Sequence, residues 1–286
     1  MKIIKISIVT LILFFSFISS AQYISKKDKN NLIELSNNII SSSDDNKKIN
    51  NEMFIEQIEQ ILYDEKSFYE MFDFINNSAS IIMSEDKKIK IISWFLPLKD
   101  GHEFFCFIQE MIDKDYNFFF YKSGEITENY QKKSDLYKTK TINRENWIGS
   151  IYYDIKKYKT NNQDYYVLIG WSGNKLANYK IIEPMFFDQK KQEFQFGQPV
   201  FKINDEILHR YILSYYINSK LTLEFYDNQT IVFENLTKNN INSMPEGSYN
   251  ALILKDEKWI LKDNFTPKTK LKLKKRKKIN NNLFPN

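Results

Sequence analysis

One stretch of eleven residues most constrains what this chain can fold into. Residues 164–174 read Asp-Tyr-Tyr-Val-Leu-Ile-Gly-Trp-Ser-Gly-Asn. Side chains alternate between the two faces of an extended strand, so each face can be examined separately. One face carries Tyr165, Val167, Ile169 and Trp171, and the other carries Tyr166 and Leu168. Because both faces are apolar, the stretch predicts a central strand that is buried on both sides.

The end of this stretch holds two glycines and a turn-like tripeptide. Gly170 lies inside the apolar run, where a missing side chain indicates a bulge or a close approach of another backbone. We expect Gly170 to make room for Trp171, which would pack in the core. Ser172, Gly173 and Asn174 tolerate turn dihedral angles and are predicted to end the strand. Trp171, Ser172, Gly173 and Asn174 together form the candidate ligand or turn motif of this chain.

From residue 88 onward the apolar residues recur with a period of two. The predicted strands are residues 88–96, 103–112, 117–122, 148–157, 165–171, 179–187, 208–217, 221–226, 230–236, 249–254 and 258–262. Short polar connections join most of them and imply antiparallel neighbours, because parallel neighbours need a crossover of about a dozen residues or more. Pro184 falls inside one strand and predicts an edge position or a bulge. The expected fold class is mostly β (α+β): a curved antiparallel sheet, barrel-like or sandwich, with an N-terminal helical segment.

Residues 22–83 are predicted to form that helical segment. Apolar residues recur there at helical spacing, at Leu32, Leu35, Ile39, Phe54, Ile58, Ile61 and Leu62. The polar faces carry as much Glu as Lys, which favours an amphipathic cover packed on a sheet over a helix lying on an anionic bilayer. The β domain is expected to span residues 84–265.

The N-terminus predicts export. Two lysines and an apolar run over residues 6–18 are followed by small residues at positions 19–21. This pattern is typical of a signal peptide, so we expect residues 1–21 to be cleaved before Gln22. The apolar run is shorter than the ~20 residues of a spanning helix, and no later stretch is long and apolar enough to span a membrane. The mature chain is therefore expected to have no transmembrane helix and to lie in the periplasm or outside the cell.

The positive charge of the chain is concentrated at its C-terminus. The net charge is +5, yet eight basic residues lie in the predicted tail, residues 266–286: Lys268, Lys270, Lys272, Lys274, Lys275, Arg276, Lys277 and Lys278. Such a block repels itself and buries no core, so we expect it to be disordered in isolation. It would attract an anionic envelope component, such as anionic lipid or lipopolysaccharide phosphate, or serve only as a solubilising end. No specific nucleic-acid signal is present.

Five segments together resemble a group of exported proteins of the Bacteroidota that have no assigned activity. They are SEDKKIKIISW (84–94), GWSGN (170–174), FGQPVF (196–201), IVF (231–233) and PEGSY (245–249). The resemblance covers roughly residues 60–262 and implies export and the extent of the domain. Members of the group tend to have Asp where this chain has Ser172 and Asn250.

The nucleophiles in this sequence lack the spacing of known catalytic motifs. Ser172 is followed by Gly after one residue instead of two, and no helix is predicted beyond it. A Ser-Asp-His order does exist, with Asp188 or Asp205 before His209. The single cysteine, Cys106, is four residues from His102, and strand spacing would hold the two about 13 Å apart. We therefore predict a buried Cys106 and no catalytic residues.

Metal and cofactor motifs are also lacking. Residues 113–117 imitate the start of a calcium loop, but its sixth position is Phe118 and its twelfth is Gly124, where Gly and Glu are required. No Gly-rich phosphate loop or dinucleotide fingerprint occurs, so no cofactor is expected. Glu183, Glu206 and Glu224 could supply a pair of glycosidase carboxylates only if the fold brought two of them together.

Aromatic residues are abundant, with 4 Trp and 18 Tyr. They suit either the filling of a core or a binding groove that stacks on sugars or peptides. Because the sequence contains no recognised catalytic motif, we hypothesise that the protein is an exported, non-enzymatic binding or envelope-associated protein. The alternative is a hydrolase acting on envelope glycan or peptide.

Overall fold

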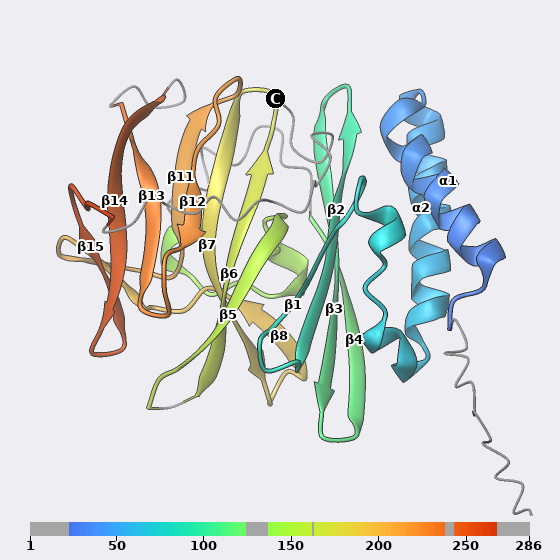
Figure 1. Cartoon of the computed structure of the whole chain (residues 1–286), viewed down its shortest axis with the longest axis horizontal. Coiled ribbons are helices and arrows are strands. Elements are labelled where there is room, and N and C mark those ends of the chain that lie inside the picture. The colour runs from blue at the N-terminus through green and yellow to red at the C-terminus, as the bar shows by residue number, and fades with distance from the viewer. Residues whose placement is uncertain (1–22, 124–136, 162, 238–242, 268–286) are drawn as a thin grey trace, which may run out of the picture.

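The computed structural model describes residues 23–123, 137–161, 163–237 and 243–267. Its elements stack in four layers, a helical layer and three β-sheets one behind another (Figure 1). The helices cover the first sheet, and the middle sheet lies between the first sheet and the third.

The first sheet is a meander of β1 (Ser80–Met83), β2 (Ile89–Leu98), β3 (Gly101–Ile112) and β4 (Asp115–Lys122). The middle sheet has the order β11 (Tyr211–Tyr216), β7 (Ala177–Asp188), β6 (Asp164–Gly173) and β5 (Ile151–Lys159), with β8 (Glu193–Phe196) pairing with β7. The third sheet has the order β10 (Glu206–Leu208), β9 (Phe201–Ile203), β15 (Lys258–Lys262), β14 (Pro245–Lys255), β13 (Thr230–Leu236) and β12 (Leu223–Phe225). The pairing of β9 with β15 is parallel, and the other pairings of the described strands are antiparallel.

The helical layer consists of α1 (Lys26–Ser41), α2 (Asp44–Leu62) and two short 3-10 turns, η1 (Glu65–Tyr69) and η2 (Asp73–Ile75). The Ser25 hydroxyl caps α1 by accepting a hydrogen bond from the Asp28 backbone N–H at 3.1 Å. The apolar helix faces pack on the first sheet around Trp94, whose indole N–H donates to the Asn51 side chain at 2.8 Å. The helices therefore form the sheet cover that their periodicity predicts.

Strand β6 occupies the centre of the molecule. Each of its residues from Tyr165 to Gly173 is buried, as the apolar pattern on both faces predicts. Gly170 was predicted to make room for Trp171, but the structure gives Gly170 and Gly173 different neighbours. A Cβ on Gly170 would lie 2.1 Å from Ser150 Oγ, whereas a Cβ on Gly173 would lie 2.8 Å from the Trp171 ring. Gly173, not Gly170, makes room for Trp171.

Pro184 lies in β7, a strand with neighbours on both sides, so the predicted edge position is wrong. On one side β7 pairs with β11 up to Ile182 and then with β8 from Met185. The Pro184 carbonyl accepts from Gly197 N–H on that side, and the N–H that proline lacks would point the same way. Pro184 therefore lies at the point where β7 changes partner, and no ladder hydrogen bond is lost there.

The prediction of a mostly β, antiparallel fold with an N-terminal helical segment is confirmed, and its sheets stack like a sandwich. Four short strands were not predicted, β1, β8, β9 and β10. Among the described residues, none of the helices combines the length and apolar character needed to cross a bilayer.

Candidate functional site

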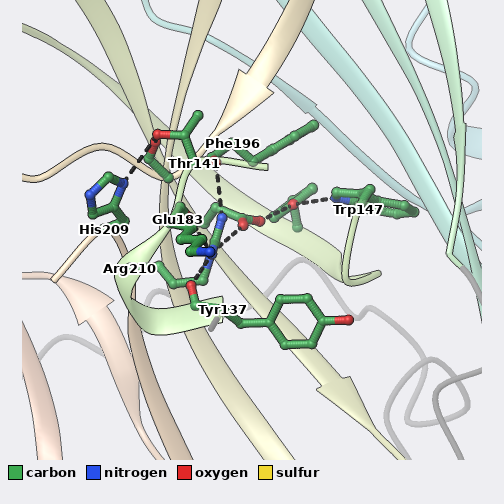
Figure 2. A network of polar contacts seen from close by, with 10 residues as sticks. Tyr137, Thr141, Trp147, Glu183, Phe196, His209 and Arg210 are labelled. Atoms are coloured by element: carbon green, nitrogen blue, oxygen red, sulfur yellow. Dashed lines mark hydrogen bonds and ion pairs between the residues drawn. The ribbon is translucent and has the colours of Figure 1, made fainter. Parts of the chain in front are cut away.

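A buried ion pair lies between two strands of the middle sheet. Arg210 Nε donates to Glu183 Oε1 at 2.8 Å, and neither side chain is exposed to solvent (Figure 2). The register of the sheet explains the pairing, because Tyr211 lies opposite Ile182 and so the next residues outward, Arg210 and Glu183, face each other. Two charges removed from water must be paired, since an unpaired buried ion costs several kcal/mol.

The second oxygen of the Glu183 carboxylate is also occupied. The Tyr152 hydroxyl donates to Glu183 Oε2 at 2.5 Å, and the Trp147 indole N–H donates to the Tyr152 oxygen at 2.9 Å. Burial, together with the Glu183 carboxylate, raises the pKa of Tyr152 well above its ordinary value. Tyr152 therefore stays protonated and serves as a donor to the carboxylate.

The two terminal nitrogens of the Arg210 guanidinium donate hydrogen bonds to backbone carbonyls. Nη2 donates to the Phe196 oxygen at 2.9 Å, and Nη1 donates to the oxygens of Tyr137 and Lys140 (Figure 2). Ile142 and Phe196 exchange two backbone hydrogen bonds beside this point. A single guanidinium therefore ties residues 137–142 to the end of β8, using the fixed fork of donors that arginine provides.

Gly197 is required by this arrangement. Its φ is +87°, a left-handed conformation that favours glycine, and a Cβ there would lie 2.6 Å from Arg210 Nη2. The Gly197 carbonyl accepts from the Thr141 hydroxyl at 2.8 Å, and the same hydroxyl lies 3.1 Å from His209 Nδ1. Burial and the nearby positive charge of Arg210 lower the pKa of His209, so this ring is neutral at neutral pH.

A cavity of about 330 Å³ opens beside this network. The residues that line it come from the segment tied down by Arg210, from the 3-10 turn η3 (Arg144–Asn146) and from β8 with the turn before it. They are Tyr137, Lys140, Thr141, Ile142, Asn143, Asn146, Lys191 and Gln195. This lining includes two residues with ammonium groups, three with side-chain amides and two with hydroxyls, and none of these residues carries a carboxylate.

The predicted motif at the end of β6 lies away from this cavity. Trp171 is only 2% exposed, and its ring centre lies 5.5 Å from that of Phe95 in the first sheet. Ser172 and Gly173 still belong to β6, so the strand ends later than predicted. The turn begins at Asn174, whose side-chain oxygen accepts from the backbone N–H groups of the residues two and three positions later.

The residues of the hypothetical hydrolytic triad are not brought together. Ser172 is fully buried and pairs with Tyr179, which in turn pairs with Ser214. His209 lies five residues before Ser214, which corresponds to about 16 Å along the strand direction. No hydrogen bond joins Ser172 to His209 in the part of the chain that the structure describes.

Cys106 and His102 lie on one strand, β3, with three residues between them. Burial and the charge of Glu183 raise the pKa of the Cys106 thiol well above its ordinary value, so the thiolate is disfavoured. Burial also lowers the pKa of His102, which packs against the rings of Phe95 and Trp171. Cys106 is the small apolar core residue that its phenylalanine neighbours predict.

The three glutamates considered as glycosidase carboxylates lie in different environments. Glu183 is buried in the ion pair, Glu206 is exposed in β10, and Glu224 lies in the three-residue strand β12 of the third sheet. Residues 113–117 form the turn between β3 and β4 and the start of β4. Among the described residues, no group of three or more His, Cys, Asp or Glu side chains could hold a metal ion.

The predicted polyanion-binding tail and the predicted signal peptide lie outside the described residues. A scan against models of known protein families finds no match to this chain, and a search of curated proteins finds no significant match. The resemblance to exported Bacteroidota proteins therefore stays a prediction.

The cavity and its supporting ion pair were not predicted from the sequence. One signal could have pointed to Arg210, because only three of the 41 basic residues are arginines. An arginine retained among so many lysines indicates a site that uses its planar fork of donors. A second signal is Glu183, the one charged residue within the apolar run of residues 181–187 in β7.

Proposed function

We propose that this protein is an exported binding protein that holds a small, oxygen-rich anion in the cavity beside residues 137–143. The observation that carries the proposal is the chemistry of the lining, in which Lys140, Lys191 and the amides of Asn143, Asn146 and Gln195 face a common space. Ammonium and amide N–H groups donate hydrogen bonds, and the strongest acceptors for them are charged oxygens such as those of a carboxylate or phosphate. The volume of about 330 Å³ suits a small molecule.

The wall of this cavity is held in place before any ligand arrives. Arg210 fixes the backbone of Tyr137 and Lys140, and the backbone pair between Ile142 and Phe196 joins that wall to β8. Lys191 Nζ donates to Gln195 Oε1 at 3.2 Å, which orients one ammonium group at the cavity. A wall that is already ordered loses little conformational entropy on binding, and this supports a binding role.

A binding role is favoured over hydrolysis because the reactive groups discussed above are sequestered from the cavity. Ser172 and Cys106 are fully buried elsewhere in the core, and the Glu183 carboxylate is saturated by Arg210 and Tyr152. The part of the cavity lining that the structure describes contains no His, Cys, Asp or Glu to act as a nucleophile or general base.

Isothermal titration calorimetry tests the ligand class, with inorganic phosphate and galacturonate as anionic probes and galactose as the neutral one. We expect the anions to bind and galactose to bind at least about tenfold more weakly. The double variant Lys140→Gln/Lys191→Gln should lose anion binding. Lys190→Gln removes the neighbouring exposed lysine, which does not line the cavity, and is the matched control.

Equal binding of galactose and galacturonate, or unchanged binding by the double variant, would refute this assignment.

Export is supported by the lysines, the apolar run and the small residues of positions 1–21. Mass spectrometry of the exported chain should find Gln22 at its N-terminus, and intact Met1 in a soluble cytoplasmic fraction would contradict export.

The basic tail supports attachment to an anionic envelope component. Near an anionic bilayer each basic residue contributes on the order of 1 kcal/mol, so the eight residues between 268 and 278 suffice for reversible attachment at low salt. Deleting residues 268–286 should leave the melting temperature unchanged and abolish salt-sensitive binding to phosphatidylglycerol vesicles. If the full chain and the truncated chain bind these vesicles equally, the tail has no such role.

A further inference from the structure

A second surface hollow is lined by the end of α2 and by the turn between β3 and β4. Its volume is about 850 Å³. One wall consists of the last turn of α2 and the start of η1, and the other consists of the β3–β4 turn and the first residues of β4. The hollow shares no residue with the cavity near Arg210.

An exposed aromatic ring forms part of this hollow. Tyr63, the residue that ends α2, is 70% exposed to solvent. Its ring makes a T-shaped contact with Phe118, with ring centres 5.3 Å apart and an interplanar angle of 84°. Because this contact supports the ring from one side and leaves it exposed, Tyr63 offers a flat apolar surface to a ligand.

The two walls are fastened to each other by Tyr116. Its hydroxyl donates to the Leu62 carbonyl at 2.6 Å and accepts from the Gln109 amide at 2.7 Å. The same hydroxyl lies 3.2 Å from Ser67 Oγ on η1. The partly buried Tyr116 hydroxyl therefore holds β4 against both α2 and η1, so the shape of the hollow does not depend on a ligand.

Polar groups with planar geometry line the hollow together with Tyr63. Asp64, Glu65 and Asp115 contribute carboxylates to the lining, and Gln60 and Asn117 contribute amides. The one cation in the lining is Lys114, so the described lining is acidic overall. This excess repels anionic ligands, in contrast to the lysines of the other cavity.

We infer that this hollow binds a neutral or amine-bearing sugar unit of a glycan. The C–H face of a hexose ring is apolar and stacks on an aromatic ring, while its hydroxyl pairs match carboxylate and amide groups at the rim. The exposed Tyr63 ring, which packs on Phe118 and shares the hollow with acids and amides, provides both kinds of contact. The inference stands independently of the anion cavity, because the two sites have no lining residue in common.

Calorimetry with four oligosaccharides tests the inference on the full chain. The probes are glucosamine tetramer, N-acetylglucosamine tetramer, cellotetraose and tetragalacturonate. These titrations use Lys140→Gln/Lys191→Gln, in which the anion cavity no longer competes for tetragalacturonate. In that variant we expect binding of the amine-bearing or neutral oligomers and at least about tenfold weaker binding of tetragalacturonate. Tyr63→Ala should weaken saccharide binding by about tenfold or more, whereas Tyr63→Trp should retain it.

Tyr69→Ala is the matched control. Tyr69 is 69% exposed, lies on η1 and does not line the hollow, so its loss should leave saccharide binding unchanged. Both tyrosines are on the surface, so neither variant should change the melting temperature. The inference fails if no saccharide binds, if tetragalacturonate binds as well as the others, or if Tyr63→Ala binds like the native protein. Lys140→Gln/Lys191→Gln should retain saccharide binding, which separates failure here from failure of the anion cavity.

Discussion

The ammonium group of Lys90 lies 4.9 Å from the centre of the Phe72 ring, beneath the helical layer. Lys90 is fully buried, and its Nζ donates to the backbone carbonyls of Ser67 at 2.5 Å and Glu70 at 2.8 Å. The Phe72 backbone has φ +50°, in the left-handed region that is costly for an aromatic residue. These contacts join the segment between η1 and η2 to β2 and hold it in that conformation.

Stability at alkaline pH provides a test of this burial. Burial lowers the pKa of Lys90 to about 7, whereas a lysine in the unfolded chain titrates at about 10.4. Between these values the unfolded chain holds a proton that the native protein has lost. The contribution of Lys90 to the unfolding free energy is therefore largest above pH ~10.4 and decreases as the pH falls towards 7. We predict that the unfolding free energy of the native protein, relative to that of Lys90→Met, rises from pH 7 to pH 10 by at most about 1.4 kcal/mol per pH unit.

Urea unfolding followed by circular dichroism at pH 7, 8.5 and 10 measures this difference. Comparing the native protein with Lys90→Met removes the contribution of the tyrosines, which titrate in both proteins. Lys66→Met is the control, because Lys66 is exposed on η1 and should show no pH-dependent difference. A difference between native protein and Lys90→Met that stays constant with pH would mean that the carbonyls and the Phe72 ring keep Lys90 charged despite its burial.

The Arg210–Glu183 pair predicts strong non-additivity. Glu183→Gln or Arg210→Met alone leaves one buried charge without its partner and should lower the unfolding free energy by ~3–5 kcal/mol. The double variant Glu183→Gln/Arg210→Met removes both charges and should lose less than the sum of the two single changes, by about 0.5–3 kcal/mol. Urea unfolding of all four proteins closes this cycle.

A surface ion pair serves as the matched control for this cycle. Lys157 and Asp164 pair at 2.8 Å with side chains that are 33% and 49% exposed, so its coupling should be at most about 1 kcal/mol. If the Arg210–Glu183 coupling is no larger than this, the ion pair is not isolated from water in the native protein.

The position of β6 was predictable because a strand buried on both faces consists of consecutive apolar residues, a pattern that is visible within a short stretch of sequence. The helical layer was predictable for the same reason, since Leu32 and Leu35 repeat at local helical spacing. The roles of the glycines were not, because they depend on a neighbour from another strand. Ser150, just before β5, crowds Gly170, and no pattern in residues 164–174 identifies that neighbour.

The candidate sites were beyond the sequence for a related reason. Arg210 and Glu183 are 27 residues apart and meet only through the register of β7 with β11. The strand beside the anion cavity, β8, has four residues, too few for a period of two to stand out. In the hollow proposed to bind saccharide, Tyr63 contacts Phe118 of β4, which is 55 positions away in the sequence.

Gly170→Ala should destabilise the protein although the change adds a single methyl group. The new Cβ would lie 2.1 Å from Ser150 Oγ and 2.9 Å from the Tyr152 ring, closer than real contacts allow. Overpacking of this kind typically costs ~1–3 kcal/mol. Ser150→Gly removes the nearer atom and should recover part of the loss in the double variant, measured by urea unfolding. Full stability of Gly170→Ala alone would show that β5 and β6 are not packed as closely as described.

Variants of Trp171 test whether this residue packs in the core or contacts a ligand. Its ring packs on Phe95 and Phe104, and truncating a buried aromatic side chain costs ~3–5 kcal/mol. We therefore expect Trp171→Ala to lower the melting temperature markedly, and Trp171→Phe to lower it less because much of the ring volume remains. Tyr69→Ala provides the comparison for an exposed ring, and its unfolding free energy should change by no more than about 0.5 kcal/mol.

Because Trp171 lines neither the anion cavity nor the saccharide hollow, each folded molecule of Trp171→Phe should bind phosphate and glucosamine tetramer with native affinity. Loss of either ligand with unchanged melting temperature would instead place Trp171 on a binding surface.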